Sequence, residues 1–177
     1  MDRWIIHLIW ENVLFLLLST AILAAIGLAW RRAEPYRLPL PFPPWVKWWF
    51  ATVQVTGVLL PILAWLIWGV WGQFSTVSLV WIPILGMLSW QILAEHLTLR
   101  WFSSVAWVAV PYLYLPYRFW QLVEGLRILD PDPALSWVRG LLWLNIGVWL
   151  VNYCLDLSQL PRLFHWPDPL KAEELSD

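Results

Sequence analysis

Two short polar groups carry the side chains of this chain that could do chemistry beside long apolar segments. In the first group, His7 and Glu11 are four residues apart, so on a helix they share one face. An imidazole and a carboxylate placed in this way are typical of a proton site, a metal site or a pigment ligand. The same spacing also occurs in a polar turn at the membrane surface. The pair lies near the start of its apolar segment and therefore needs no buried partner.

The second group follows a long apolar run and consists of Glu95, His96 and Arg100. Glutamate and histidine at helix ends are used by intramembrane proteases and similar enzymes. Such enzymes need a further ligand or acid on another helix, and the chain has no HExxH or paired-glutamate motif. Glu95 and Arg100 are five residues apart, which is poor spacing for an ion pair on a continuous helix. The alternative is a polar cap on a loop.

Tryptophan is the third feature, with 18 residues among 177. Trp65 and Trp68 are three residues apart and share a helix face, where flat indole surfaces could line a planar apolar ligand such as a quinone or a pigment. Helix packing and lipid contact are the alternative. Other tryptophans lie near the ends of expected membrane spans, the depth that indole rings prefer: Trp4, Trp10, Trp30, Trp45, Trp48, Trp49, Trp101, Trp120 and Trp137.

The composition indicates the elements that must hold these residues. The chain is 60% hydrophobic and 13% charged, and its mean hydropathy is +0.62. A soluble domain carries about 25% charged residues, so an ordinary soluble globule is excluded. The net charge of −1 and the lack of a basic stripe argue against a nucleic-acid partner. We therefore predict an all-α, polytopic membrane bundle whose first partner is the lipid bilayer.

Charge-free runs predict five hydrophobic helices with four or five crossings, because one crossing takes about 20 apolar residues. The 47 residues from Trp48 to Ala94 contain no charge and must fold back, and Gly72–Thr76 has the residue types of a turn. Residues 101–117 are short for a span and could cross, re-enter or lie at the interface. The expected spans in a single domain, 1–155, are 5–30, 48–71, 77–95, 101–118 and 135–155.

Three other segments complete the expected architecture. Residues 31–47 contain five prolines and should form an extended connector, since proline lacks the amide donor. The segment Arg118–Asp132 is amphipathic and should form a short interfacial helix or dock a partner. Residues 156–177 should form a polar, flexible tail.

Lysine and arginine predict the orientation. With the N-terminus outside, the cytoplasmic side receives 7 of the 11 basic residues for five crossings and 8 of 11 for four. Both versions place residues 31–47 in the cytoplasm. The Trp-, Pro- and Leu-rich texture is similar to that of small multi-pass proteins of photosynthetic bacterial membranes, which implies a bacterial inner membrane or a thylakoid-like membrane.

Three functional hypotheses follow. The first is a non-catalytic subunit, scaffold or assembly factor of a larger membrane complex, self-associating or bound to other subunits and contacting a quinone or pigment. The second is a small oligomeric transporter or channel, whose path would use the few polar residues inside spans, chiefly Gln54, Thr56 and Asn145. The third is an intramembrane enzyme that uses Glu95 and His96.

Overall fold

The computed structural model describes residues 2–29, 44–102, 105–129 and 133–158, and nearly all of them are helical. The prediction of an all-α helical bundle is confirmed. The elements in chain order are α1 (Asp2–Ala29), α2 (Pro44–Gln54), η1 (Val55–Leu59), α3 (Leu60–Ala64), η2 (Trp65–Trp71), α4 (Ser75–Phe102), α5 (Val105–Ile128), η3 (Pro133–Leu135) and α6 (Ser136–Ser158).

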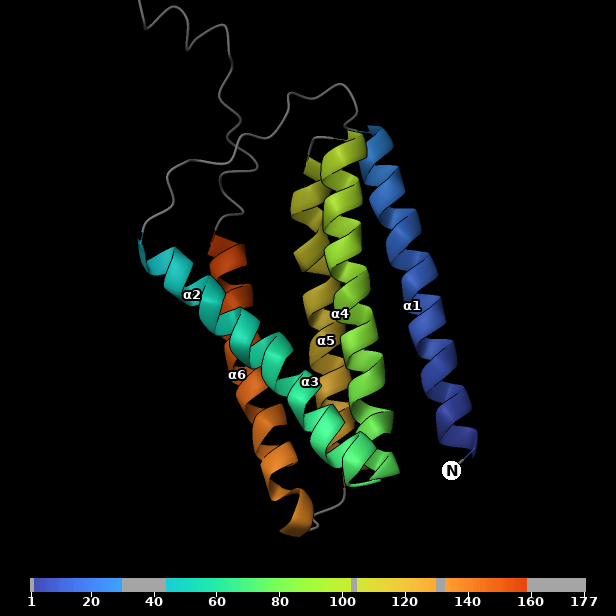
Figure 1. Ribbon diagram of the computed structural model, residues 1–177. Coiled ribbons are helices and arrows are strands. Elements are labelled where there is room, and N and C mark those ends of the chain that lie inside the picture. The colour runs from blue at the N-terminus through green and yellow to red at the C-terminus, as the bar shows by residue number, and fades with distance from the viewer. Residues whose placement is uncertain (1, 30–43, 103–104, 130–132, 159–177) are drawn as a thin grey trace, which may run out of the picture.

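The helices run alternately up and down, and α5 lies in the middle (Figure 1). The run from α2 through η2 is one helical arm, which descends to the turn before α4. Helices α1, α4 and α6 all pack against α5, while the arm packs against α4 and α6. The central position of α5 means that its side chains face other helices on several sides.

Four helical segments are long and apolar enough to cross a membrane: Ile5–Ala29, Pro44–Trp71, Ser75–Phe102 and Pro133–Ser158. The chain is therefore a polytopic membrane protein. Helix α5 carries more charged residues and is not among the four segments that are apolar enough to cross. Its 24 residues nevertheless extend about 36 Å. Arg118 and Glu124 on α5 are buried against its neighbours, while Arg127 is exposed. Helix α5 runs through the bundle beside the four apolar spans (Figure 1).

The helical arm from Pro44 to Trp71 changes its winding on both sides of Pro61. Because Pro61 has no amide hydrogen, one carbonyl in the preceding turn loses its helical donor. The adjacent segments η1 and η2 are π-helical, the wider winding that is used where the regular ladder is interrupted. Gly57 of η1 lies against α6, since a Cβ there would stand 2.7 Å from Trp149 Cζ2.

The turn predicted near Gly72 is confirmed. Gln73 adopts φ 55°, a left-handed conformation that ends the arm. The amide of Gly72 donates to the Ile67 carbonyl at 2.8 Å, and the amide of Phe74 donates to the Trp68 carbonyl at 3.0 Å. Helix α4 then begins at Ser75.

The structure corrects three predicted boundaries. The polar stretch Glu95–Arg100, expected to connect the spans 77–95 and 101–118, belongs to the last turns of α4, where Thr98 Oγ1 donates to the Ala94 carbonyl. The separate interfacial helix predicted for 118–132 is also wrong, because these residues up to Ile128 continue α5 and turn their polar face into the bundle. Residues 44–47 belong to α2, since proline fits the first turn of a helix. The rest of the predicted connector and residues 159–177 of the predicted tail lie outside the described residues.

Candidate functional site

A cleft of about 1060 Å³ lies between α1 and α4, with α5 at its back. Figure 1 shows α1 close to α4 at the end of the bundle where α4 ends and diverging toward its own N-terminus. Gly27 permits α1 to approach α4 closely where α4 ends, because a Cβ at Gly27 would lie 2.6 Å from the Phe102 ring. Ser19 Oγ and Tyr114 Oη, 3.1 Å apart and buried, join α1 to α5 above the cleft.

The cleft has a mainly apolar lining with polar groups on one side. Its residues on α1 and α4 are mostly aliphatic, with Trp90 at the upper end and serine and threonine hydroxyls at the lower end. Gly86 stands at the wall, and a Cβ there would meet no atom within 4 Å. The principal lining residues are Ile5, Leu8, Ile9, Asn12, Val13, Leu16, Ser75, Thr76, Leu79, Ile82, Pro83, Gly86, Met87, Trp90, Glu124 and Arg127.

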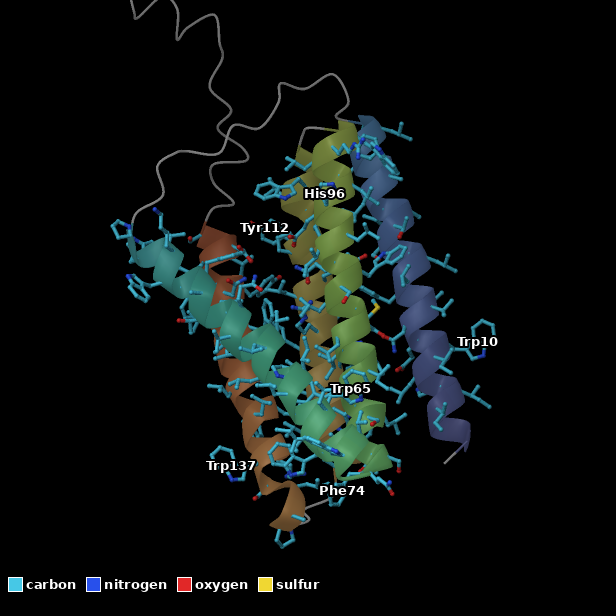
Figure 2. The ribbon with its side chains drawn as sticks, viewed as in Figure 1. Trp10, Trp65, Phe74, His96, Tyr112 and Trp137 are labelled. Atoms are coloured by element: carbon cyan, nitrogen blue, oxygen red, sulfur yellow. The ribbon has the colours of Figure 1, made fainter. Side chains whose placement is uncertain are left out.

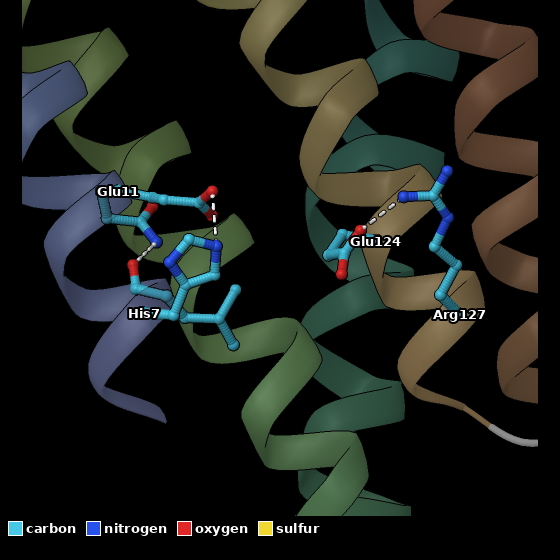
Figure 3. A network of polar contacts seen from close by, with 6 residues as sticks. His7, Glu11, Glu124 and Arg127 are labelled. Carbon is cyan, nitrogen blue, oxygen red and sulfur yellow. Dashed lines mark hydrogen bonds and ion pairs between the residues drawn. The ribbon is translucent and has the colours of Figure 1, made fainter. Parts of the chain in front are cut away.

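Two ion pairs lie at the lower half of this region (Figure 3). On α5, Arg127 Nη1 donates to Glu124 Oε2 at 3.0 Å. On α1, His7 Nε2 lies 3.1 Å from Glu11 Oε1, and the side chain of His7 is exposed. The structure thus brings the predicted pair His7–Glu11 together, at the surface of α1. Among the described residues, no three His, Cys, Asp or Glu side chains gather in a way that could hold a metal ion.

Three helices meet in a polar contact behind the cleft. Asn12 Nδ2 on α1 donates to the Leu8 carbonyl at 2.6 Å. Gln121 Nε2 on α5 donates to Asn12 Oδ1 at 2.8 Å and lies 3.5 Å from the Pro83 carbonyl on α4. Gln121 is 8% exposed, and its Oε1 is buried with no partner among the described residues. An unpaired buried acceptor is costly, so this oxygen is a candidate for contact with a bound molecule.

A side cavity of about 20 Å³ adjoins the cleft at this point. Asn12, Gln121 and Glu124 line it together with Tyr117 and Leu79. Its volume is sufficient for one oxygen atom of a water molecule or hydroxyl group. The cleft and the side cavity share lining residues from all three helices: Leu8, Asn12, Leu79, Pro83, Glu124 and Ile128.

The second predicted group separates in the structure. Glu95 is partly buried and accepts a hydrogen bond from Gln91 Nε2 at 2.8 Å. His96 and Arg100 are exposed on α4, and Figure 2 shows His96 near the upper end of that helix. The structure therefore joins Glu95 to Gln91, one turn earlier on α4, while His96 faces outward.

Gln91 connects Glu95 to a buried guanidinium group. Arg118 Nη2 donates to Gln91 Oε1 at 2.6 Å, and Arg118 is 2% exposed. Its Cζ lies 4.1 Å from the centroid of the Trp149 ring, which provides a cation–π contact between α5 and α6. Nε and Nη1 of Arg118 are buried without partners among the described residues. This network joins α4, α5 and α6 in the core, away from the cleft.

Trp65 and Trp68 pack beside the main hydrophobic core, and neither lines the cleft. Figure 2 shows Trp65 on the arm where it crosses in front of α4. The indole that does line the cleft is Trp90 on α4. The expectation that Trp65 and Trp68 contact an apolar ligand stays a prediction.

The burial of the polar face of α5 was not expected from the sequence. Arg118, Gln121 and Glu124 are spaced three residues apart, which places them along one face of a helix. The amphipathic pattern of Arg118–Asp132 instead favours an interfacial helix, whose polar residues face water. The signal that could have corrected it is the shortness of 101–117, because joining that run to 118–128 gives one full-length helix. Polar residues of such a helix turn toward the interior of the bundle.

No protein-family model, curated protein or solved structure matches this chain. The function must therefore be inferred from the geometry of the molecule.

Proposed function

We propose that this protein is a non-catalytic membrane protein that holds an elongated apolar molecule in the cleft between α1, α4 and α5. In this role it serves as a subunit, scaffold or assembly factor of a larger membrane complex. The observation that carries the proposal is the cleft itself, whose volume of about 1060 Å³ is at the upper end of ligand sites, about 300–1,000 Å³.

The shape of the cleft favours a long molecule. Along α4 its lining extends from Ser75 to Trp90, which corresponds to about 22 Å of helix. Several lining side chains, including Ile9, Val13 and Ile82, are exposed, so the cleft opens sideways to the surroundings of the bundle. In a membrane these surroundings are lipid chains, from which an apolar molecule can enter without crossing water.

The proposed location follows the sequence expectations. With the N-terminus of α1 outside, the lower end of the bundle in Figure 1 faces the outside, and the ends of α1 and α4 face the cytoplasm. Exposed tryptophans at both ends, Trp71 and Trp137 below and Trp48 and Trp101 above, support a transverse orientation. A bacterial inner membrane or a thylakoid-like membrane is the proposed site, with a quinone or a pigment among the candidate ligands.

Helix α6 supports the proposal of a protein partner. Gly140 and Gly147 are seven residues apart on one face, and a Cβ at either position would meet no atom within 4 Å. Small residues on an uncovered face permit the close approach of another membrane helix. This face is separate from the cleft, so partner binding and ligand binding can be tested by different substitutions.

The contacts of the polar side chains inside the spans give less support to the transport and enzyme hypotheses. The hydroxyl groups of Thr52 and Thr56 donate to backbone carbonyls one turn earlier in the arm. Asn145 Nδ2 donates to the carbonyls of Thr56 and Leu141. These side chains bond to backbone carbonyls, within the arm, within α6 and from α6 to the arm, and among the described residues they do not form a continuous path. Glu95 and His96 do not converge on a common point.

The test fills the cleft with a side chain. Gly86→Trp places an indole in the open wall of the cleft, and Gly147→Trp places the same group on the outer face of α6. Full-length proteins are extracted in mild detergent and examined by native mass spectrometry. We expect a stoichiometric apolar adduct on the wild type and on Gly147→Trp, and its loss from Gly86→Trp. An adduct that survives Gly86→Trp, or a wild type without any adduct, contradicts the proposal.

A further inference from the structure

Gln121 lines the side cavity beside the cleft, and its unpaired oxygen indicates which kind of group that cavity can receive. The Leu8 carbonyl can only accept a hydrogen bond, so the atom of Asn12 that faces it must be Nδ2. Asn12 Oδ1 therefore faces Gln121, which must present Nε2 to it. The Pro83 carbonyl on the same side of Gln121 also requires a donor. The network thus leaves Gln121 Oε1, an acceptor, as the free atom.

The surroundings of this oxygen favour a neutral donor. Two carboxylates line the same side cavity, and each already has a basic partner: Glu124 contacts Arg127 and Glu11 contacts His7. An ammonium group would need a free carboxylate, and a phosphate or quinone carbonyl offers only acceptors. A hydroxyl group is neutral, can donate to Gln121 Oε1, and places a single oxygen in a cavity of about 20 Å³.

We propose that the occupant of the cleft is a neutral lipid alcohol whose hydroxyl group enters the side cavity and donates to Gln121 Oε1. This inference rests on the proposed function, because it specifies the chemistry of the molecule held there. Pro83 marks the level of the hydroxyl, about midway along the cleft between Ser75 and Trp90. From this level the apolar chain follows α4 past Gly86 and Met87 toward Trp90. Among redox forms of a quinone, the quinol fits this contact and the quinone does not.

The test compares two probes that differ in one hydrogen-bond donor. Geranylgeraniol and its methyl ether have the same apolar chain, but only the alcohol can donate. Equilibrium binding of each tritiated probe is measured with full-length protein in detergent. We expect the wild type to bind the alcohol about tenfold more tightly, since the ether leaves a buried acceptor unpaired.

Two variants test whether the preference for the alcohol depends on Gln121. Gln121→Leu removes the acceptor and should bring the two probes to equal affinity. Gln54→Leu makes the same change at an exposed position of α2, outside the cleft, and should retain the tenfold preference. If Gln121→Leu does not fold, the comparison of the two probes on the wild type still decides whether a hydroxyl group is recognised.

The outcomes separate this inference from the proposed function. Equal binding of both probes to the wild type, abolished for both by Gly86→Trp, overturns the hydroxyl contact and leaves the apolar cleft in place. Binding that Gly86→Trp does not change, or no binding of either probe to the wild type, overturns the proposed function and this inference with it. A preference for the alcohol that persists in Gln121→Leu overturns the role of Gln121.

Discussion

The contact between η1 and α6 at Gly57 predicts that replacing glycine by alanine changes the free energy of unfolding in opposite directions at Gly57 and at Gly147. A Cβ at residue 57 would stand 2.7 Å from Trp149 Cζ2, whereas ordinary contacts begin at 3.4 Å. Gly57→Ala therefore forces a shift of about 0.7 Å, the difference between these two distances. Trp149 cannot easily supply this shift, because it is 6% exposed and its ring carries the Arg118 guanidinium.

The expected magnitude is a difference between two effects. Overpacking of a filled core costs about 1–3 kcal/mol. Replacing glycine by alanine inside a helix returns about 1 kcal/mol. We expect Gly57→Ala to lower the free energy of unfolding by up to about 2 kcal/mol, the difference between these two effects. Gly147→Ala on α6 meets no atom within 4 Å and should raise it by up to about 1 kcal/mol.

The assay is SDS-induced unfolding of the purified full-length proteins in mixed micelles, followed by far-ultraviolet circular dichroism. The free energies of unfolding of the wild type and both variants are compared under the same micelle composition. The reasoning is refuted if Gly57→Ala is as stable as Gly147→Ala, because the glycine would then not be required by the approach of Trp149.

Two further measurements test the attachment of α1 and the crossing of α5. In a double-mutant cycle, Ser19→Ala and Tyr114→Phe should show a coupling energy of about 1 kcal/mol in the same unfolding assay, since they remove one buried hydrogen bond; simple additivity would contradict the contact. Single cysteines at Trp101 and Trp137, both exposed, are introduced in a Cys154→Ser background and labelled with a membrane-impermeant maleimide. If α5 crosses the membrane, the two positions react from opposite sides, and labelling from one side alone would show that it does not cross.

The outer helices could be predicted from the sequence, whereas the place of α5 in the bundle could not. The outer spans are apolar on all sides, so their charge-free runs indicate them directly. Helix α5 carries Arg118 and Glu124, which a linear reading assigns to water. In the bundle Arg118 is buried between α4 and α6, where Gln91 and Trp149 offset the cost of burial. Glu124 is buried beside α1 and α4 and is paired with Arg127. The partners of Arg118 come from distant positions of the chain, and no local pattern reveals them.

The candidate site was only partly predictable for the same reason. The helical membrane class and the turn at Gly72 follow from the sequence, because hydropathy and backbone preference are properties of single residues and their neighbours. Only the tertiary structure decided that α1 closes on α4 at Gly27 and diverges below, which creates the cleft. It also decided that Gln121 meets Asn12 across 109 positions and keeps one oxygen unpaired. Such features depend on distances between helices, and these are set by packing across the whole bundle.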